Sequence, residues 1–259
     1  RHLGRLRQLT FGGNNAEAYF SADGKWLTFQ RQQAVDAGCD QQFIMKTDGS
    51  SLKQISNGLG RTTCGYFIEK DQRIIFSSTF RDDPACPVPP DRAQGYVWPL
   101  GRFELFTVKR DGTDLKQLTN TGSYNAEATV SKDGKRVIFT STRDGDVELY
   151  TMNPDGSDVR RITNRVGYDG GAFFSPDGKR VIWRRFDERG VIADVWTMNL
   201  DGTDQRQITD FGAMSWAPYI HPSGRYILFA SNKLGFENFE LFLVDLDGTK
   251  EPIRVTYSD

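Results

Sequence analysis

Three carboxylates stand at comparable places in segments that are far apart in the sequence, and they have the chemistry of a cation site. They are Glu17, Glu127 and Asp169, and two amides, Asn15 and Asn125, accompany them. Carboxylate and amide oxygens are ligands that Ca²⁺ accepts, and a carboxylate also forms strong ion pairs with Lys or Arg. The sequence therefore predicts a calcium site or a site that forms an ion pair with a cationic side chain of a partner. The alternative is that these acids are solvated and bind no ligand. Calcium is the one cofactor that the sequence suggests.

A repeated unit of about 45 residues positions these side chains. The clearest copy contains four short strand-like segments, at residues 127–130, 136–140, 148–152 and 159–163. β-Branched and aromatic residues suit a pleated surface, and Asp-Gly pairs between the segments supply the positive φ of tight hairpins. Each unit is therefore expected to form four strands. Helical periodicity is sustained nowhere in the chain, so the predicted fold class is all-β.

Two sets of anchor residues give the register of the repeat. A hydroxyl closes each unit, at Thr10, Ser56, Thr119, Thr163, Thr209 and Thr256. An aromatic residue ends the second segment, at Phe29, Phe76, Phe139, Trp183 and Phe229. The intervals are nearly constant except in the second unit, which carries an insertion. A repeat of this length built from short strands is typical of propeller blades.

The repeat also resembles that of a known family. The segment Phe174–Ile182 (Phe-Ser-Pro-Asp-Gly-Lys-Arg-Val-Ile), with Glu148–Asn153 and Arg160–Thr163, resembles the WD40-like repeat of TolB-like propellers over essentially the whole chain. The resemblance implies a six-bladed propeller that is exported to the periplasm or the cell surface. It also implies a protein-binding platform, and similar repeats precede the catalytic domains of secreted peptidases.

We predict a single propeller domain over residues 1–259, with a closing strand at residues 6–10 and five full four-stranded blades. The predicted blades span residues 11–56, 57–119, 120–163, 164–209 and 210–256. The partners of the closing strand are expected after Thr256, where the chain ends about three strands short of a sixth blade. Three explanations fit: an excerpt of a longer polypeptide, closure with five blades, or strands donated by another chain, which would give self-association into a filament.

In propellers of this kind the first strand of each blade lines a central channel. Counting back from the turns gives one position in each blade whose side chain is expected to face the channel: Glu17, Cys64, Glu127, Gly171 and Ala217. The positions two residues earlier are expected to face the same way: Asn15, Thr62, Asn125, Asp169 and Ser215. The family geometry would thus gather the three carboxylates into a polar, acidic ring.

The cysteines allow one intrachain disulfide. There are three, Cys39, Cys64 and Cys86, and all lie in the first two units. In an exported protein Cys39 and Cys86 would join neighbouring loops and leave Cys64 unpaired, but pairing of Cys64 with either one fits the sequence equally well. Three reduced thiols are the remaining alternative.

The insertion of the second unit is rich in proline and carries two candidate contact residues, Tyr96 and Trp98. Proline makes the segment stiff and irregular, and Tyr and Trp are frequent in binding hot spots. We expect the insertion either to cap the channel mouth or bind a partner, or else to hold its own loop against the blade.

Composition excludes several function classes. The formal net charge is −1, so no large field of one sign is available for nucleic acid or an anionic bilayer. No apolar stretch approaches the roughly 20 residues of a membrane span, and no signal peptide is visible, so we expect one to have been removed. With two histidines, His2 and His221, a nucleophile lacks a suitable base, and no catalytic residue is predicted.

The sequence therefore predicts a non-enzymatic, periplasmic or extracellular module that binds a protein or peptide. The predicted contacts are Glu17, Glu127, Asp169, Tyr96 and Trp98. The alternative is an auxiliary propeller that positions substrate for a hydrolase domain beyond Asp259, and the third is a subunit of a surface filament.

Overall fold

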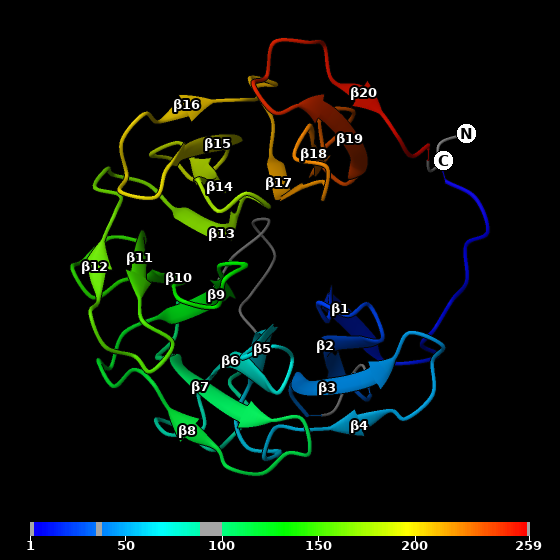
Figure 1. Cartoon of the computed structure of the whole chain (residues 1–259), viewed down its shortest axis with the longest axis vertical. Coiled ribbons are helices and arrows are strands. Elements are labelled where there is room, and N and C mark those ends of the chain that lie inside the picture. Colours follow the sequence, from blue (N-terminus) through cyan, green and yellow to red (C-terminus); the bar gives the residue numbers. More distant parts are fainter. Residues whose placement is uncertain (1–2, 35–37, 89–99, 258–259) are drawn as a thin grey trace. The chain divides into compact units, whose positions relative to one another are not determined.

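The structure is a computed structural model that describes residues 3–34, 38–88 and 100–257. These residues contain twenty short β-strands and no helix. The strands form five four-stranded sheets, and in every sheet consecutive strands are neighbours (Figure 1). The prediction of an all-β fold with five four-stranded units is confirmed.

The chain divides into two compact units. The N-terminal unit contains Gln8–Ala128 and Ser141–Arg143, and the C-terminal unit contains Arg1–Arg7, Thr129–Thr140 and Asp144–Asp259. The first and second sheets lie in the N-terminal unit, and the fourth and fifth lie in the C-terminal unit. The third sheet contributes residues to both.

The strands of the first two sheets alternate with hairpin turns. The first sheet comprises β1 (Asn14–Phe20), β2 (Trp26–Gln32), β3 (Gln41–Lys46) and β4 (Lys53–Gln54). The second comprises β5 (Thr62–Ile68), β6 (Arg73–Ser78), β7 (Glu104–Lys109) and β8 (Lys116–Gln117). The insertion separates β6 from β7.

The remaining three sheets repeat the same order. The third comprises β9 (Asn125–Val130), β10 (Val137–Ser141), β11 (Glu148–Met152) and β12 (Arg160–Arg161). The fourth comprises β13 (Asp169–Phe174), β14 (Arg180–Phe186), β15 (Ala193–Asn199) and β16 (Arg206–Gln207). The fifth comprises β17 (Ser215–Ile220), β18 (Tyr226–Ser231), β19 (Glu240–Asp245) and β20 (Ile253–Arg254).

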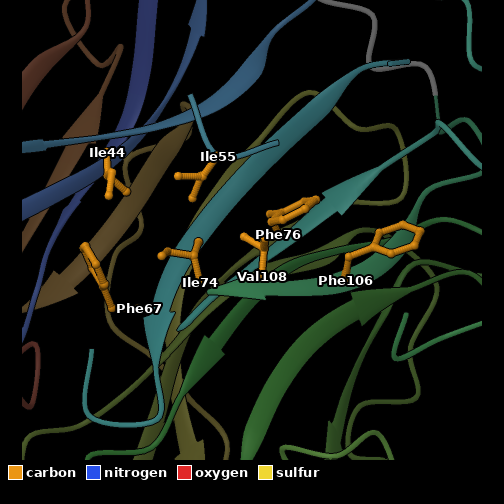
Figure 2. Close-up of a cluster of buried hydrophobic side chains, with 7 residues drawn as sticks. All are labelled: Ile44, Ile55, Phe67, Ile74, Phe76, Phe106 and Val108. Carbon is orange, nitrogen blue, oxygen red and sulfur yellow. The ribbon is translucent and has the colours of Figure 1, made fainter. Parts of the chain in front are cut away.

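The aromatic anchors of the repeat are core residues. Their side chains are at most 2% exposed: Phe29, Phe76, Phe139, Trp183 and Phe229. In the N-terminal unit the core between the first and second sheets contains Ile44, Ile55, Phe67, Ile74, Phe76, Phe106 and Val108 (Figure 2). Burial of these apolar side chains is the main term that holds one sheet on the next.

The closing hydroxyls of the repeat extend the very short fourth strands. Those of the five sheets each accept a hydrogen bond from a backbone N–H of the third strand of their sheet. The donors are Leu105 for Thr119, Leu149 for Thr163, Val195 for Thr209 and Leu241 for Thr256, at 2.8–2.9 Å, and Gln42 for Ser56, at 3.0 Å. A fourth strand has only two residues, so the hydroxyl satisfies a donor that the ladder would leave unpaired.

Residues 6–10, predicted as a closing strand, do not form a strand in the structure. A strand needs a neighbour that bonds to its backbone groups, and within the described residues no strand pairs with this segment. Leu9 nevertheless packs on the buried face of the first sheet, formed by Leu27, Phe29, Phe43 and Met45. It takes the place on the first sheet that Ile55 takes on the second.

A β-bulge interrupts the first strand of the sheets at a constant place. In β1 the pairing with β2 shifts between Ala16 and Tyr19, and β5, β13 and β17 shift at matching points. The residues at this place have a positive φ of 48–61°: Glu17, Cys64, Glu127, Gly171 and Ala217. They are the same residues that counting from the turns assigns to one channel-facing position in each blade. Left-handed backbone is unfavourable for all of them except glycine.

We expect Ala217→Gly to raise the free energy of unfolding by about 1 kcal/mol, because glycine adopts a positive φ without steric cost. Ala217 is exposed, so the substitution removes no packing. Ala18→Gly is the matched control: Ala18 is an exposed strand residue without a positive φ, and its substitution should be destabilising. Urea unfolding measures both. If both substitutions changed the free energy of unfolding in the same direction, the backbone strain assigned to Ala217 would be contradicted.

Candidate binding site

The first strands of three sheets bring acidic and phenolic side chains together in the N-terminal unit. The Tyr19 hydroxyl donates to Glu17 Oε2 at 2.6 Å, and the Tyr19 ring packs edge-on against Tyr66 with centroids 5.3 Å apart. The pKa of Tyr19 is raised well above its ordinary value, first by burial and then by the charge of Glu17, with smaller contributions from Cys64 and Glu127. We call Glu17, Tyr19, Cys64, Tyr66 and Glu127 the acidic patch.

The bulge determines how this patch is presented. Glu17 is exposed, and Glu127 and Cys64 are half-buried. A bulge leaves its extra residue outside the regular ladder and redirects that side chain. The side chains at the bulge therefore do not pack between sheets; in this patch they are those of Glu17, Cys64 and Glu127.

Asp169 has a different environment in the C-terminal unit. Its side chain is 1% exposed, and it accepts hydrogen bonds from Arg185 Nε at 2.7 Å, Arg185 Nη2 at 2.8 Å and Trp183 Nε1 at 2.7 Å. Burial raises the pKa of this carboxyl, and the ion pair with Arg185 offsets part of that shift. The Asp169 oxygens are thus used inside the fourth sheet.

The two predicted amides also differ. Asn125 is fully buried and donates to Glu104 Oε2 at 3.1 Å, while its Oδ1 accepts from the Ser141 hydroxyl at 2.8 Å. Asn15 is exposed and donates to the Gly12 carbonyl at 3.1 Å. In the described ranges no three His, Cys, Asp or Glu side chains are grouped so that they could hold a metal ion. Calcium at Glu17, Glu127 and Asp169 stays a prediction.

The remaining predicted site residues are the cysteines and the two aromatic residues of the insertion. Cys39 and Cys86 are joined by a disulfide with their Cα atoms 5.5 Å apart, and Cys64 is not part of it. This bond connects the β2–β3 loop of the first sheet to the start of the insertion in the second. Tyr96 and Trp98 lie outside the described residues.

A set of buried or half-buried acids that the sequence prediction missed lies at the start of the third strands. The set consists of Glu104, Glu148, Asp194 and Glu240. Glu240 accepts from the closing hydroxyl of Thr256 and from Arg254 at 2.8 Å, and Asp194 accepts from Thr209 at 2.9 Å. Their recurrence at a near-constant interval before the closing hydroxyl is a signal that the sequence offers. Glu148, Asp194 and Glu240 thus bond to the last strand of their sheets. Glu104 instead accepts from the backbone N–H groups of Thr121 and Gly122, which lie beyond that strand.

Asp194 should make stability depend on pH. Burial raises its pKa from 3.8 to about 6, against the hydrogen bonds from Thr209 and Gln207 that lower it. The folded protein therefore binds more protons than the unfolded chain between these two values. The stabilisation is fully present below the lower value and is lost as the pH rises through about 6. We expect Asp194→Asn to gain stability relative to the wild type from about pH 4 to about pH 7. A constant difference in urea unfolding across that range would contradict this.

Comparison with known proteins decides the family. A family model described as the TolB beta propeller domain matches residues 98–257. The matched stretch is more than half of the 259 residues. The chain belongs to the TolB beta propeller family. Its five sheets are propeller blades, and the predicted resemblance is confirmed.

Solved structures show the same fold. The structure of putative TolB from Agrobacterium tumefaciens has a TM-score of 0.69 at 18% identity, covering 93% of this chain and 80% of that chain. TolB from Acinetobacter baumannii has a TM-score of 0.70 at 18% identity, covering 91% and 53%. The tricorn protease has a TM-score of 0.66 at 16% identity, covering 96% and 23%.

This propeller chain therefore spans about half of the Acinetobacter baumannii protein and less than a quarter of the tricorn protease. No match was found among curated proteins compared by sequence. In the described part of the chain, no helix has the length and apolar character needed to cross a membrane.

Proposed function

We propose that this propeller is a non-enzymatic, exported module that binds a protein or peptide, and that the acidic patch receives a Lys or Arg side chain of the partner. The observation that carries the proposal is the environment of Tyr19. Glu17 and Glu127 come from first strands of different blades, and both act electrostatically on this one phenol. The repeat thus concentrates negative charge at one place on a chain whose formal net charge is only −1.

The chemistry of the patch suits a cationic side chain. Glu17 is oriented by the hydroxyl of Tyr19, which leaves its carboxylate in a defined position. An ammonium or guanidinium placed beside it would form charge-assisted hydrogen bonds. A partner segment that carries Lys or Arg would therefore gain from the negative charge of the patch.

The disulfide supports export. Such bonds form and persist in oxidising compartments, which include the periplasm and the extracellular space. The bond between Cys39 and Cys86 thus fits the exported location that the family resemblance implies.

Binding of an array of peptides with Lys, Arg, Glu or Gln at each position tests the proposal. The wild-type protein should retain peptides that contain Lys or Arg, and Glu17→Gln with Glu127→Gln should weaken their binding at least tenfold. Glu188→Gln with Glu237→Gln is the matched control, because both of these carboxylates are exposed and lie outside the acidic patch. Equal retention by all three proteins, or retention that does not depend on basic residues, would refute the proposed contact.

A second candidate function is substrate positioning for a hydrolase domain in a longer polypeptide. The observation that favours it is the likeness to the tricorn protease, a chain of which this one covers 23%. Determination of the full polypeptide separates the two functions. A hydrolase region after Asp259 would support the second function, and a short completion of the propeller would support the first.

A further inference from the structure

A cavity lies between the first and second blades beside the disulfide, apart from the residues of the acidic patch. Its volume is about 320 Å³. The side chains that matter are Arg31, Gln33, Gln41 and Gln54, with the cystine of Cys39 and Cys86 in the wall. All these residues belong to the N-terminal unit. We propose that this cavity, which we call the Arg31 pocket, binds one carboxylate group.

Arg31 supplies a cation that has no ion-pair partner in the part of the chain that the structure describes. It lies in β2 directly opposite Gln41 in β3, so both side chains are on one face of the sheet. The guanidinium carbon is 5.9 Å from the centroid of the Phe43 ring. Arg31 Nε is buried and makes no hydrogen bond, and among the described residues no carboxylate forms an ion pair with this side chain.

Two other polar side chains of the Arg31 pocket, Gln41 and Gln54, already make hydrogen bonds. Gln41 Nε2 donates to the Gly60 carbonyl at 2.9 Å, and Gln41 Oε1 accepts from the Ser56 hydroxyl at 2.7 Å. Gln54 Nε2 donates to the Ser56 carbonyl at 3.2 Å. These bonds fix two of the walls, while the Arg31 guanidinium is the charged group of the lining that makes no hydrogen bond to any residue that the structure describes. Arg31 Nε is closed off from solvent, so an anion that enters the pocket would bond to the Nη donors of this half-buried guanidinium, which make no hydrogen bond within the described residues.

The charge and size of the pocket select the class of ligand. Among the described residues that line the pocket, Arg31 is the one Lys or Arg, so a single negative charge balances it, while a phosphate dianion would remain in excess. The planar fork of a guanidinium matches the two oxygens of a carboxylate. A volume of about 320 Å³ is small for a ligand site and fits one group the size of an amino acid. The carboxylate is that of a Glu or Asp side chain or of a peptide C-terminus.

The pocket goes beyond the proposed function and does not depend on it. The acidic patch attracts cations, whereas the Arg31 pocket attracts an anion. The two sites share no residue. Loss of binding at Glu17 and Glu127 would leave the Arg31 pocket intact, so failure of one proposal is distinguishable from failure of the other.

Calorimetric titration of the full chain at low salt tests the pocket with three probes. They are a Gly-Glu-Gly peptide blocked at both ends, an N-acetylated triglycine with a free C-terminus, and inorganic phosphate. At least one carboxylate probe should bind, and preference between them identifies the source of the carboxylate. Arg31→Gln should weaken that binding at least tenfold. Arg81→Gln, an exposed arginine outside the pocket, should leave it unchanged.

A second variant keeps Arg31 and fills the space. Gly58 lines the pocket with a φ of 82°, a conformation that asparagine tolerates better than other side chains, so Gly58→Asn should fold and should also weaken binding. The proposal is overturned if neither carboxylate binds at millimolar concentration, if phosphate binds more tightly than both, or if Arg31→Gln binds as the wild type does.

Discussion

We expect replacement of Cys39 and Cys86 by serine to lower the free energy of unfolding by about 4 kcal/mol. The two cysteines are 47 residues apart in the sequence, and the disulfide closes the chain between them in the unfolded state. A cross-link over this length removes a large share of the conformational freedom of the unfolded chain. Guanidinium unfolding of the wild-type and double-serine proteins measures the difference.

A reducing agent provides the control for this experiment. It should destabilise the wild type and leave the double-serine variant unchanged, because Cys64 is not in the disulfide. A double-serine variant within about 1 kcal/mol of the wild type would contradict the predicted loop constraint.

The second large effect concerns the buried ion pair of the fourth blade. We expect Asp169→Ala to cost about 3–5 kcal/mol, because it leaves Arg185 charged, 8% exposed and without a counter-ion. The substitution also removes the acceptor of Trp183 Nε1. Urea unfolding measures the loss.

A double-mutant cycle separates the ion pair from simple truncation. Asp169→Leu combined with Arg185→Met should recover most of the stability, because it removes both charges from the interior. Asp201→Ala is the surface control: this exposed carboxylate accepts from Thr203, and its removal should cost about 1 kcal/mol or less. If the losses in the free energy of unfolding from the single substitutions at Asp169 and Arg185 simply added in the double variant, the coupling would be refuted.

The repeat could be predicted from the sequence because its anchors are local. Asp-Gly turns, the closing hydroxyls and the aromatic anchors each depend on a few adjacent residues. Phe139 and Trp183 were predicted from their place in the repeat, and both are fully buried. The family and the four strands of each blade follow from the same pattern.

The arrangement of the candidate site could not be predicted in full because a bulge breaks the alternation of side chains. Counting in steps of two placed Asp169 on the same face as the bulge residue Gly171. The bulge shifts the pairing between β13 and β14, so that Asp169 faces Arg185. Which residue lies opposite Asp169 depends on where the extra residue is inserted. The sequence shows no distinct mark for that place, since Glu17, Cys64 and Ala217 all occupy it.

The predicted closing strand at residues 6–10 is the other difference, and it depends on long-range pairing. Residues 6–10 match the closing segments of the repeat in sequence, and Leu9 packs as they do. The strand itself requires hydrogen bonds from a neighbour, which no local pattern supplies. Six-bladed completeness therefore stays a prediction.

The central claim is that first strands of different blades hold Glu17 and Glu127 around Tyr19. NMR of protein labelled with ¹³C at tyrosine Cζ follows the ionisation of Tyr19, whose signal is assigned by its absence in Tyr19→Phe. We predict that Tyr19 ionises above the ordinary tyrosine range and that Glu17→Gln and Glu127→Gln each shift its pKa downward, Glu17→Gln more strongly. An ordinary tyrosine pKa that neither substitution changes would contradict the account.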